Sequence, residues 1–171
     1  MTAFPLPEHE HDHHHCMAHA LEAAQAQCAA AGLRLTPLRR KVLELVWRTH
    51  APVGAYALLD ALQADSQTPI APPTIYRALD FLLACGLIHK IEARNGYIGC
   101  AHPSDPTHPA QFLICTSCGA VAELVDPQMT AALLKGAERL GFVVTRPSVE
   151  IEGLCARCQK AEAEERSSGA V

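Results

Sequence analysis

Two Cys-x-x-Cys pairs, Cys115/Cys118 and Cys155/Cys158, are the residues of this sequence best suited to chemistry. Each pair can place two thiolates at a tight turn, and four thiolates from two such turns suit one tetrahedral zinc ion. Disulfides are the alternative, but they require an oxidising compartment. The spacing therefore favours a structural zinc site.

A second set of ligand-type residues lies around the first pair. It comprises His89, Cys100, His108 and Glu123. Each has an ordinary structural role open to it as well: the histidines as exposed strand or loop residues, the cysteine as a small buried hydrophobe, and the glutamate at a solvated strand end. The residue types alone leave both interpretations open.

The composition indicates a globular protein of the cytoplasm. With 49% hydrophobic residues in 171, the chain can bury the core of one large domain or two small ones. Its apolar runs are too short and interrupted to cross a membrane, and the N-terminus lacks the pattern of a secretory signal. The eight cysteines are therefore expected as thiols or metal ligands. We place Cys28 and Cys85 in the core, and Cys16 has no assigned role.

The net charge of −4 is unevenly distributed. Residues 1–32 have four acidic and no basic residues, residues 33–94 have eight basic and five acidic ones, and residues 95–171 have six basic and nine acidic ones, giving −4, +3 and −3. Only the middle segment can therefore offer a nucleic-acid surface. Residues 1–16 are rich in histidine, which indicates a disordered tail, either without essential function or binding metal loosely.

Apolar periodicity predicts four helices before residue 87. An Ala-rich helix covers residues 17–31, and Thr36-Pro37 begins a second helix. A short third helix follows Gly54, and residues 72–74 open a fourth that ends at Gly86. Helical spacing assigns the following side chains to the buried faces of the last three helices: Leu38, Val42, Leu45, Val46, Leu58, Leu59, Leu62, Ile75, Leu79, Leu82 and Leu83.

The fourth helix and the segment after it favour DNA binding. Tyr76 and Arg77 lie in its first turn, opposite the apolar face, where a recognition helix reaches base edges. Arg34 and Arg39 belong to a basic cluster at the start of the second helix, which suits phosphate groups. Asn95-Gly96 between two alternating runs predicts a β-hairpin. Helices followed by a hairpin are the order of a winged helix-turn-helix domain.

The remaining residues predict a small domain of strands and one helix. Strands are expected at residues 110–114, 120–125 and within 142–152, and Asp126-Pro127 caps a helix that Gly141 ends. Such a domain is too thin to bury both faces of its sheet, so we expect a partner subunit. Four residues of the helix are expected inside: Leu133, Leu134, Ala137 and Leu140.

Several motifs occur together along most of the chain. They are Arg34-x-Thr36-x-x-Arg39, PTIYRAL at residues 73–79, GLIHK at residues 86–90 and the two Cys-x-x-Cys pairs. Between about residues 18 and 160 the sequence resembles the ferric uptake regulator (Fur) family, and most closely those members that control zinc uptake. The resemblance implies an α+β homodimer that represses transcription when its metal site is filled.

The resemblance also implies a division of the chain. A His-rich tail (1–16) precedes a winged-helix DNA-binding domain (17–100), and a hinge (101–109) leads to a dimerisation domain (110–160) with a flexible tail (161–171). Two zinc ions are implied per subunit. The structural one is bound by Cys115, Cys118, Cys155 and Cys158, and the regulatory one, at the hinge, by His89, Cys100, His108 and Glu123. The implied contacts to a palindromic, AT-rich DNA operator are Thr74, Tyr76, Arg77, Arg34 and Arg39.

The chain departs from the iron-type members of that family, which typically carry several histidines just before the first cysteine pair. Here residues 108–115 read HPAQFLIC, with one histidine. Cys100 makes the hinge set two nitrogens, one sulfur and one oxygen, which suits four-coordinate zinc better than iron. His102 is close enough in sequence to compete as a ligand. We therefore predict a zinc-responsive repressor of zinc-uptake genes, with an iron-sensing regulator as the alternative.

Two other functional classes fit less well. A zinc hydrolase or deaminase could use Glu123 as a base, but a catalytic zinc needs an open coordination position, and no His-x-Glu or Pro-Cys-x-x-Cys signature is present. A metal chaperone relying on the His-rich start would leave the winged helix without a purpose. We expect no enzymatic activity and no small-molecule substrate.

Overall fold

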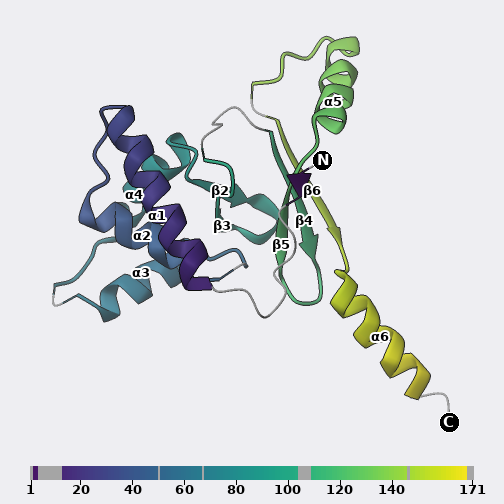
Figure 1. The fold of residues 1–171 in the computed structure, drawn as a ribbon, viewed down its shortest axis with the longest axis horizontal. Coiled ribbons are helices and arrows are strands. Elements are labelled where there is room, and N and C mark those ends of the chain that lie inside the picture. The colour runs from purple at the N-terminus through teal and green to yellow at the C-terminus, as the bar shows by residue number, and fades with distance from the viewer. Residues whose placement is uncertain are drawn as a thin grey trace. The chain divides into compact units, whose positions relative to one another are not determined.

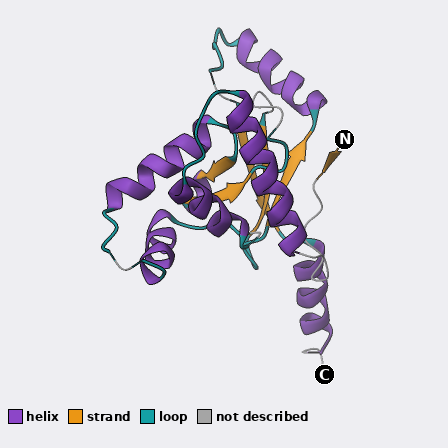
Figure 2. Ribbon diagram, turned by 60° about the vertical axis from the view of Figure 1, so that its left-hand side comes forward, coloured by secondary structure: helices purple, strands orange, loops and turns teal. Residues whose placement is uncertain are grey.

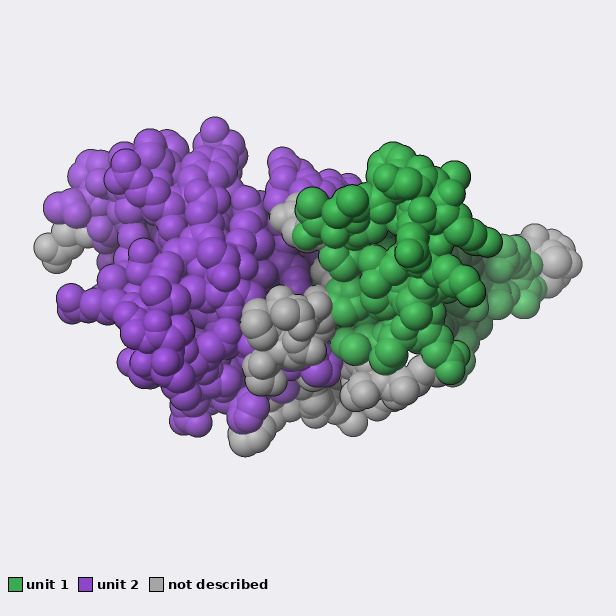
Figure 3. Space-filling view, turned by 90° about the horizontal axis from the view of Figure 1, so that it is seen from above, with its two compact units in different colours: residues 1–6, 109–171 green, residues 7–108 purple. Residues whose placement is uncertain are grey.

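A computed structural model of the chain describes residues 2–3, 13–49, 51–66, 68–103, 109–145 and 147–168. The chain forms two compact units (Figure 3), a larger one of residues 7–108 and a smaller one of residues 1–6 with 109–171. Each unit contains its own β-sheet. No helix among the described residues is long and apolar enough to cross a membrane.

The larger unit has the predicted helices and hairpin (Figures 1 and 2). Its helices are α1 (His13–Ala30), α2 (Pro37–Trp47), α3 (Ala55–Ala64) and α4 (Pro72–Ala84). The predicted apolar faces form one core, in which Leu38, Leu59 and Leu83 are only partly buried. The largest fully buried side chains of that core are Val42, Leu43, Val46, Leu58, Ile75, Leu79, Leu82 and Ile88.

Local capping explains where α2 begins and where α4 ends. Thr36 Oγ1 accepts a hydrogen bond from the backbone N–H of Arg39 at 3.4 Å, and Pro37 occupies the first helical position of α2. Gly86, with φ +67°, ends α4, as the sequence predicts. There the backbone N–H of Leu87 donates to Leu82 and that of Gly86 to Leu83, the two bonds of a Schellman motif.

The predicted hairpin follows α4. Strands β2 (Ile88–Ile91) and β3 (Gly96–Gly99) pair antiparallel, with Ile91 opposite Gly96. The predicted hairpin is therefore present, and its connection is a 3₁₀ turn, η1 (Glu92–Arg94), followed by Asn95 with φ 45°. Gly96 already belongs to β3, where an added Cβ would lie 2.8 Å from the Cβ of Pro52.

Strand β3 is attached to the helices as well as to β2. Val53 and Tyr97 exchange two backbone hydrogen bonds of 2.9 Å. Gly99 lies directly against the indole of Trp47, the last residue of α2, so closely that a Cβ at this position would overlap the ring. The hairpin is thus part of the same packed unit as α2 and α4.

The smaller unit is a four-stranded sheet in the order β1-β5-β4-β6. The strands are β1 (Thr2–Ala3), β4 (Ala110–Cys115), β5 (Val121–Val125) and β6 (Ser148–Gly153). Pairing is antiparallel except between β4 and β6, which run parallel. The strands fall within the predicted segments apart from one-residue extensions and β1, which the sequence analysis did not expect.

Two helices complete this unit, α5 (Pro127–Arg139) and α6 (Ala156–Ser168), at opposite ends of the strands in Figure 1. The first turn of α5 is attached to the sheet, where the buried Gln111 amide donates to Thr130 Oγ1 at 2.6 Å. The expectation that the leucines of α5 lie inside is wrong for the single chain, since Leu133, Leu134 and Leu140 are exposed.

Parts of the two predicted tails belong to regular elements. Residues 161–168, expected to be flexible, continue α6, because Ala, Glu and Arg favour a helix once its first turn is formed. Within residues 1–16, expected to be disordered, Thr2 and Ala3 pair with β5 and α1 begins at His13. Residues 4–12, with His9 and His11, lie outside the described residues.

Replacing Gly99 by Ala should destabilise the protein by about 1–3 kcal/mol, because the methyl group overpacks against Trp47. Chemical denaturation would measure the change in the free energy of unfolding. Combining it with Trp47→Leu, which removes the obstructing ring, should cost less than the sum of the two single changes. Strict additivity of the two losses would contradict this packing.

Candidate metal centre and nucleic-acid interface

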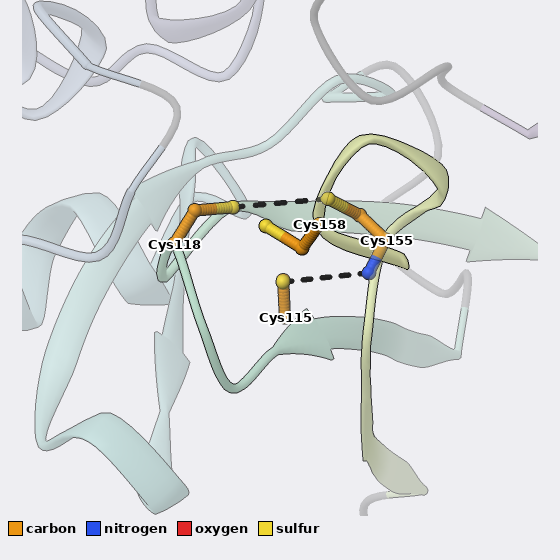
Figure 4. Close-up of side chains that lie close together, drawn as sticks. All are labelled: Cys115, Cys118, Cys155 and Cys158. Carbon is orange, nitrogen blue, oxygen red and sulfur yellow. Dashed lines mark hydrogen bonds between the residues drawn. The ribbon is translucent and has the colours of Figure 1, made fainter. Parts of the chain in front are cut away.

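Four cysteine side chains converge in the smaller unit (Figure 4). Their sulfur atoms all lie within 4.8 Å of one another, and the sulfurs of Cys118 and Cys155 are 3.9 Å apart. Zinc–sulfur bonds of about 2.3 Å in a tetrahedron place the sulfurs about 3.8 Å apart. The predicted grouping of Cys115, Cys118, Cys155 and Cys158 is thus present and fits one zinc ion.

The parallel pairing of β4 with β6 brings the two cysteine pairs together. Cys115 ends β4 and lies opposite Gly153, the last residue of β6. The backbone N–H of Thr116 donates to the Gly153 carbonyl at 2.8 Å, which extends the pairing into the first turn. Cys155 follows β6 after one residue, and Cys158 lies in the first turn of α6. Both turns therefore open toward the same point.

The surroundings of the sulfurs favour ionisation at one position and oppose it at another. Backbone N–H groups of Cys118 and Cys155 donate to the sulfur of Cys115 and lower its pKa to about 6. For Cys158, a hydrogen bond with Ser117 lowers the pKa, but the Cys155 thiol and burial outweigh it and raise the pKa to about 11. Four ionised sulfurs at this spacing repel one another, so full ionisation requires a cation among them.

The second predicted ligand set is divided between the two units. In the larger unit, His89 lies on β2 and Cys100 directly follows β3, and their ligand atoms are within 4.8 Å of each other. In the smaller unit, Glu123 lies on β5 opposite Phe112 and is buried. His108 lies outside the described residues. The backbone N–H of His102 donates to the Cys100 sulfur at 3.4 Å, so His102 contacts this pair through its main chain.

Helix α4 presents the predicted DNA-contacting side chains. Ile75, Ala78 and Leu79 are buried, whereas Arg77 is exposed and Tyr76 is 40% exposed. Thr74 lies in the first turn and is partly buried. The helix is therefore anchored on one face and offers a cation and a phenol on the other, which suits contacts to base edges.

Two aromatic residues near this surface escaped the sequence analysis. Tyr56, in the first turn of α3, is 69% exposed. In the sequence, Tyr56 lies beside the apolar stripe of Leu58 and Leu62 and not on it, and this position could have indicated an exposed side chain. Phe81, on α4, lies beneath the guanidinium of Arg39, whose Cζ is 3.5 Å from the ring centroid. No pattern in the sequence indicates this second contact.

Arg34 and Arg39 have different surroundings. Arg34 is exposed, as a phosphate-binding residue should be. Arg39 is partly buried and donates through Nη1 to the backbone carbonyl of Arg34 at 2.7 Å. The two arginines of the predicted DNA-binding set thus differ in burial and in contacts.

Replacing Cys115 by Ser should remove one zinc ion per chain and unfold the smaller unit. The variant keeps only three of the four ligands, so the coordination site at the end of β4 is left open. Metal analysis by mass spectrometry and far-ultraviolet circular dichroism would measure the two losses. Cys16→Ser, at a partly buried cysteine of α1, is the matched control and should keep the full metal content. Full zinc retention in the Cys115 variant would exclude this site.

Comparison with known proteins agrees with these features. Residues 30–152 match the model of the Ferric uptake regulator family. The chain is 40% identical over 143 residues to the zinc uptake regulation protein of Escherichia coli (strain K12), covering 84% of this chain and 83% of that protein.

Two solved structures are similar over most of the chain. One is described as a zinc uptake regulator complexed with zinc and DNA, with a TM-score of 0.79 and 40% identity, covering 86% of this chain and 97% of the other. The second, holo XcZur, has a TM-score of 0.76 and 42% identity, covering 82% and 96%. With a family model that matches most of its length and relatives at this level of identity, the chain belongs to the ferric uptake regulator family.

Proposed function

We propose that this protein is a zinc-responsive transcriptional repressor that binds palindromic, AT-rich operators of zinc-uptake genes. The observation that carries the proposal is the 40% identity, over 84% of the chain, to a zinc uptake regulation protein. A solved relative of the same identity contains both zinc and DNA. The Cys₄ cluster and the exposed side chains of Tyr76 and Arg77 on α4 supply this chain with residues for both ligands.

Two zinc ions per subunit are proposed, with separate roles. The Cys₄ cluster would hold a structural ion, and His89, Cys100, His108 and Glu123 a regulatory one. Support for the second comes from the proximity of His89 to Cys100 and from the burial of Cys100 and Glu123. A set with two imidazole nitrogens, one thiolate and one carboxylate favours zinc over iron.

The energy of such a site is large enough for regulation. Shifting a two-state equilibrium from 1:99 to 99:1 requires about 5.5 kcal/mol of differential binding. Zinc sites with four protein ligands supply about 10–16 kcal/mol in small proteins whose folding depends on the metal. Ligands drawn from both units would therefore be able to stabilise the arrangement that binds DNA over the others.

The protein is also proposed to be a homodimer. Helix α5 and the segment after it expose apolar side chains that a single chain leaves in water, with Leu140 78% and Val143 88% exposed. A second copy is the natural cover for such a surface in a member of this family, and a two-fold pair matches a palindromic site.

In the DNA complex, Tyr76, Arg77 and Thr74 would contact bases, and Arg34 would contact phosphate. Arg77 has the reach and the donor geometry for a guanine edge. Tyr56 is exposed in the neighbouring helix and is a further candidate for a DNA contact.

Replacing Arg77 by Ala should weaken operator binding by about 1–3 kcal/mol and relax the preference for one base pair, because a base contact is lost. Fluorescence anisotropy with operator variants at fixed salt would measure both effects. Arg166→Ala removes an exposed cation from α6 and should leave affinity and preference unchanged. Equal losses for the two variants would mean that only overall charge matters.

Replacing Cys100 by Ser should abolish the zinc dependence of operator binding while the protein remains folded and keeps its structural zinc. A chelator titration followed by gel shift would report the dependence, and metal analysis would show one ion lost out of two. If the variant still gains affinity with zinc as the parent does, Cys100 is not a regulatory ligand. If iron(II) in place of zinc activates the parent at lower concentration, the iron-sensing alternative holds.

A further inference from the structure

Arg39 is placed between two elements of the DNA-binding unit. It lies in the first turn of α2, while the ring beneath its guanidinium belongs to Phe81 of α4. The same guanidinium donates at 2.7 Å to the carbonyl of Arg34, in the segment before α2. One side chain thus connects the start of α2, the segment before it and the proposed recognition helix.

The contact is made along the C-terminal half of α4. Phe81 lies one helical turn beyond Arg77. Burial and the neighbouring Cys28 raise the pKa of Cys85, and the positive charge of Arg39 partly opposes this rise. A cation near the last turn interacts favourably with the carbonyl end of a helix. Gln27 of α1 also donates to the Cys85 carbonyl, at 2.7 Å. The C-terminal end of α4 is therefore held from two sides, by Arg39 and by Gln27.

We propose that Arg39 is a positioning residue, whose guanidinium sets the orientation of α4 for DNA reading instead of binding a phosphate itself. The proposal rests on the DNA-binding function proposed above. It differs from the expectation that every basic residue in the cluster at the start of α2 binds a DNA phosphate. Here one face of the guanidinium is occupied by the ring and one of its donors by a backbone carbonyl.

The chemistry of the contact requires arginine. A planar guanidinium can stack on a ring and donate in its own plane at the same time, whereas a lysine ammonium offers a point charge on a flexible stem. Lysine at position 39 would therefore keep the charge that attracts DNA and lose the geometry that holds α4. Charge and positioning can thus be separated by one conservative substitution.

The experiment measures binding of zinc-loaded full-length protein to operator and to a shuffled duplex, across a range of salt concentrations. Arg39→Lys should weaken operator binding about tenfold and leave binding to the shuffled duplex unchanged, because the loss is one of fit. Arg39→Gln should do the same without changing the slope of log affinity against log salt on the operator. Arg34→Ala is the matched control, and it should reduce that slope by about 0.9 and weaken both duplexes alike.

The partner ring supplies a second test. Phe81→Leu should weaken operator binding as Arg39→Lys does, and the double variant should be no weaker than either single one, because both remove the same contact. Parent-like operator affinity of Arg39→Lys would overturn the proposal. A slope reduced by about one in Arg39→Gln would assign Arg39 to a phosphate.

Two further readouts separate this proposal from its premise. If the parent protein shows no zinc-dependent preference for the operator, the proposed function fails. The positioning role is then decided by amide hydrogen exchange in the free protein. Arg39→Lys should speed exchange at the C-terminal turn of α4 about tenfold while leaving α3 unchanged, and unchanged exchange in α4 would overturn it.

Discussion

The parallel pairing of β4 with β6 is the contact on which the smaller unit depends. It aligns Cys115 with Gly153, so that two turns distant in the sequence open toward one point and their four sulfurs come within 4.8 Å of one another. Thiols so close cannot all ionise without a cation, and a Cys₄ zinc site resolves that repulsion. The same site holds the first turn of α6, a helix of 13 residues whose surface is mostly exposed. Because helices of this length are marginal alone, a metal ion bound at this site would also stabilise α6.

The larger unit holds one helix, α4, firmly while leaving part of its surface exposed. Helix α4 ends in a Schellman motif, and the hairpin after it is attached to Val53 and packed through Gly99 on Trp47. Such a unit leaves little freedom for a metal to reshape α4 itself. The regulation proposed above would then act on how the whole unit is presented to DNA and not on the shape of α4.

The sequence predicted those features whose causes are local. Thr36 and Gly86 mark helix ends because caps and left-handed glycines act within one turn, and the stripe from Ile75 to Leu82 follows from helical periodicity. The Cys₄ grouping was predicted because thiol pairs carry their chemistry in their spacing. The hairpin was predicted but its turn was not, since Pro52, far along the chain, packs against Gly96 and Asn95 takes the left-handed conformation.

Features that depend on distant partners were beyond the reach of the sequence. Arg34 and Arg39 belong to one basic cluster. Only the structure shows that the guanidinium of Arg39 lies over the ring of Phe81, whereas Arg34 is exposed. The leucines in α5 and just after it have the spacing of a buried face, yet Leu133 and Leu140 are exposed in the single chain. Helical spacing of apolar residues indicates a buried face, but it does not indicate whether the same chain or another molecule covers that face. A second copy of the chain packed on α5 would bury these leucines and would present two α4 helices to one palindromic site. Binding of the second helix would then be intramolecular, so a small change in their spacing would alter operator occupancy strongly.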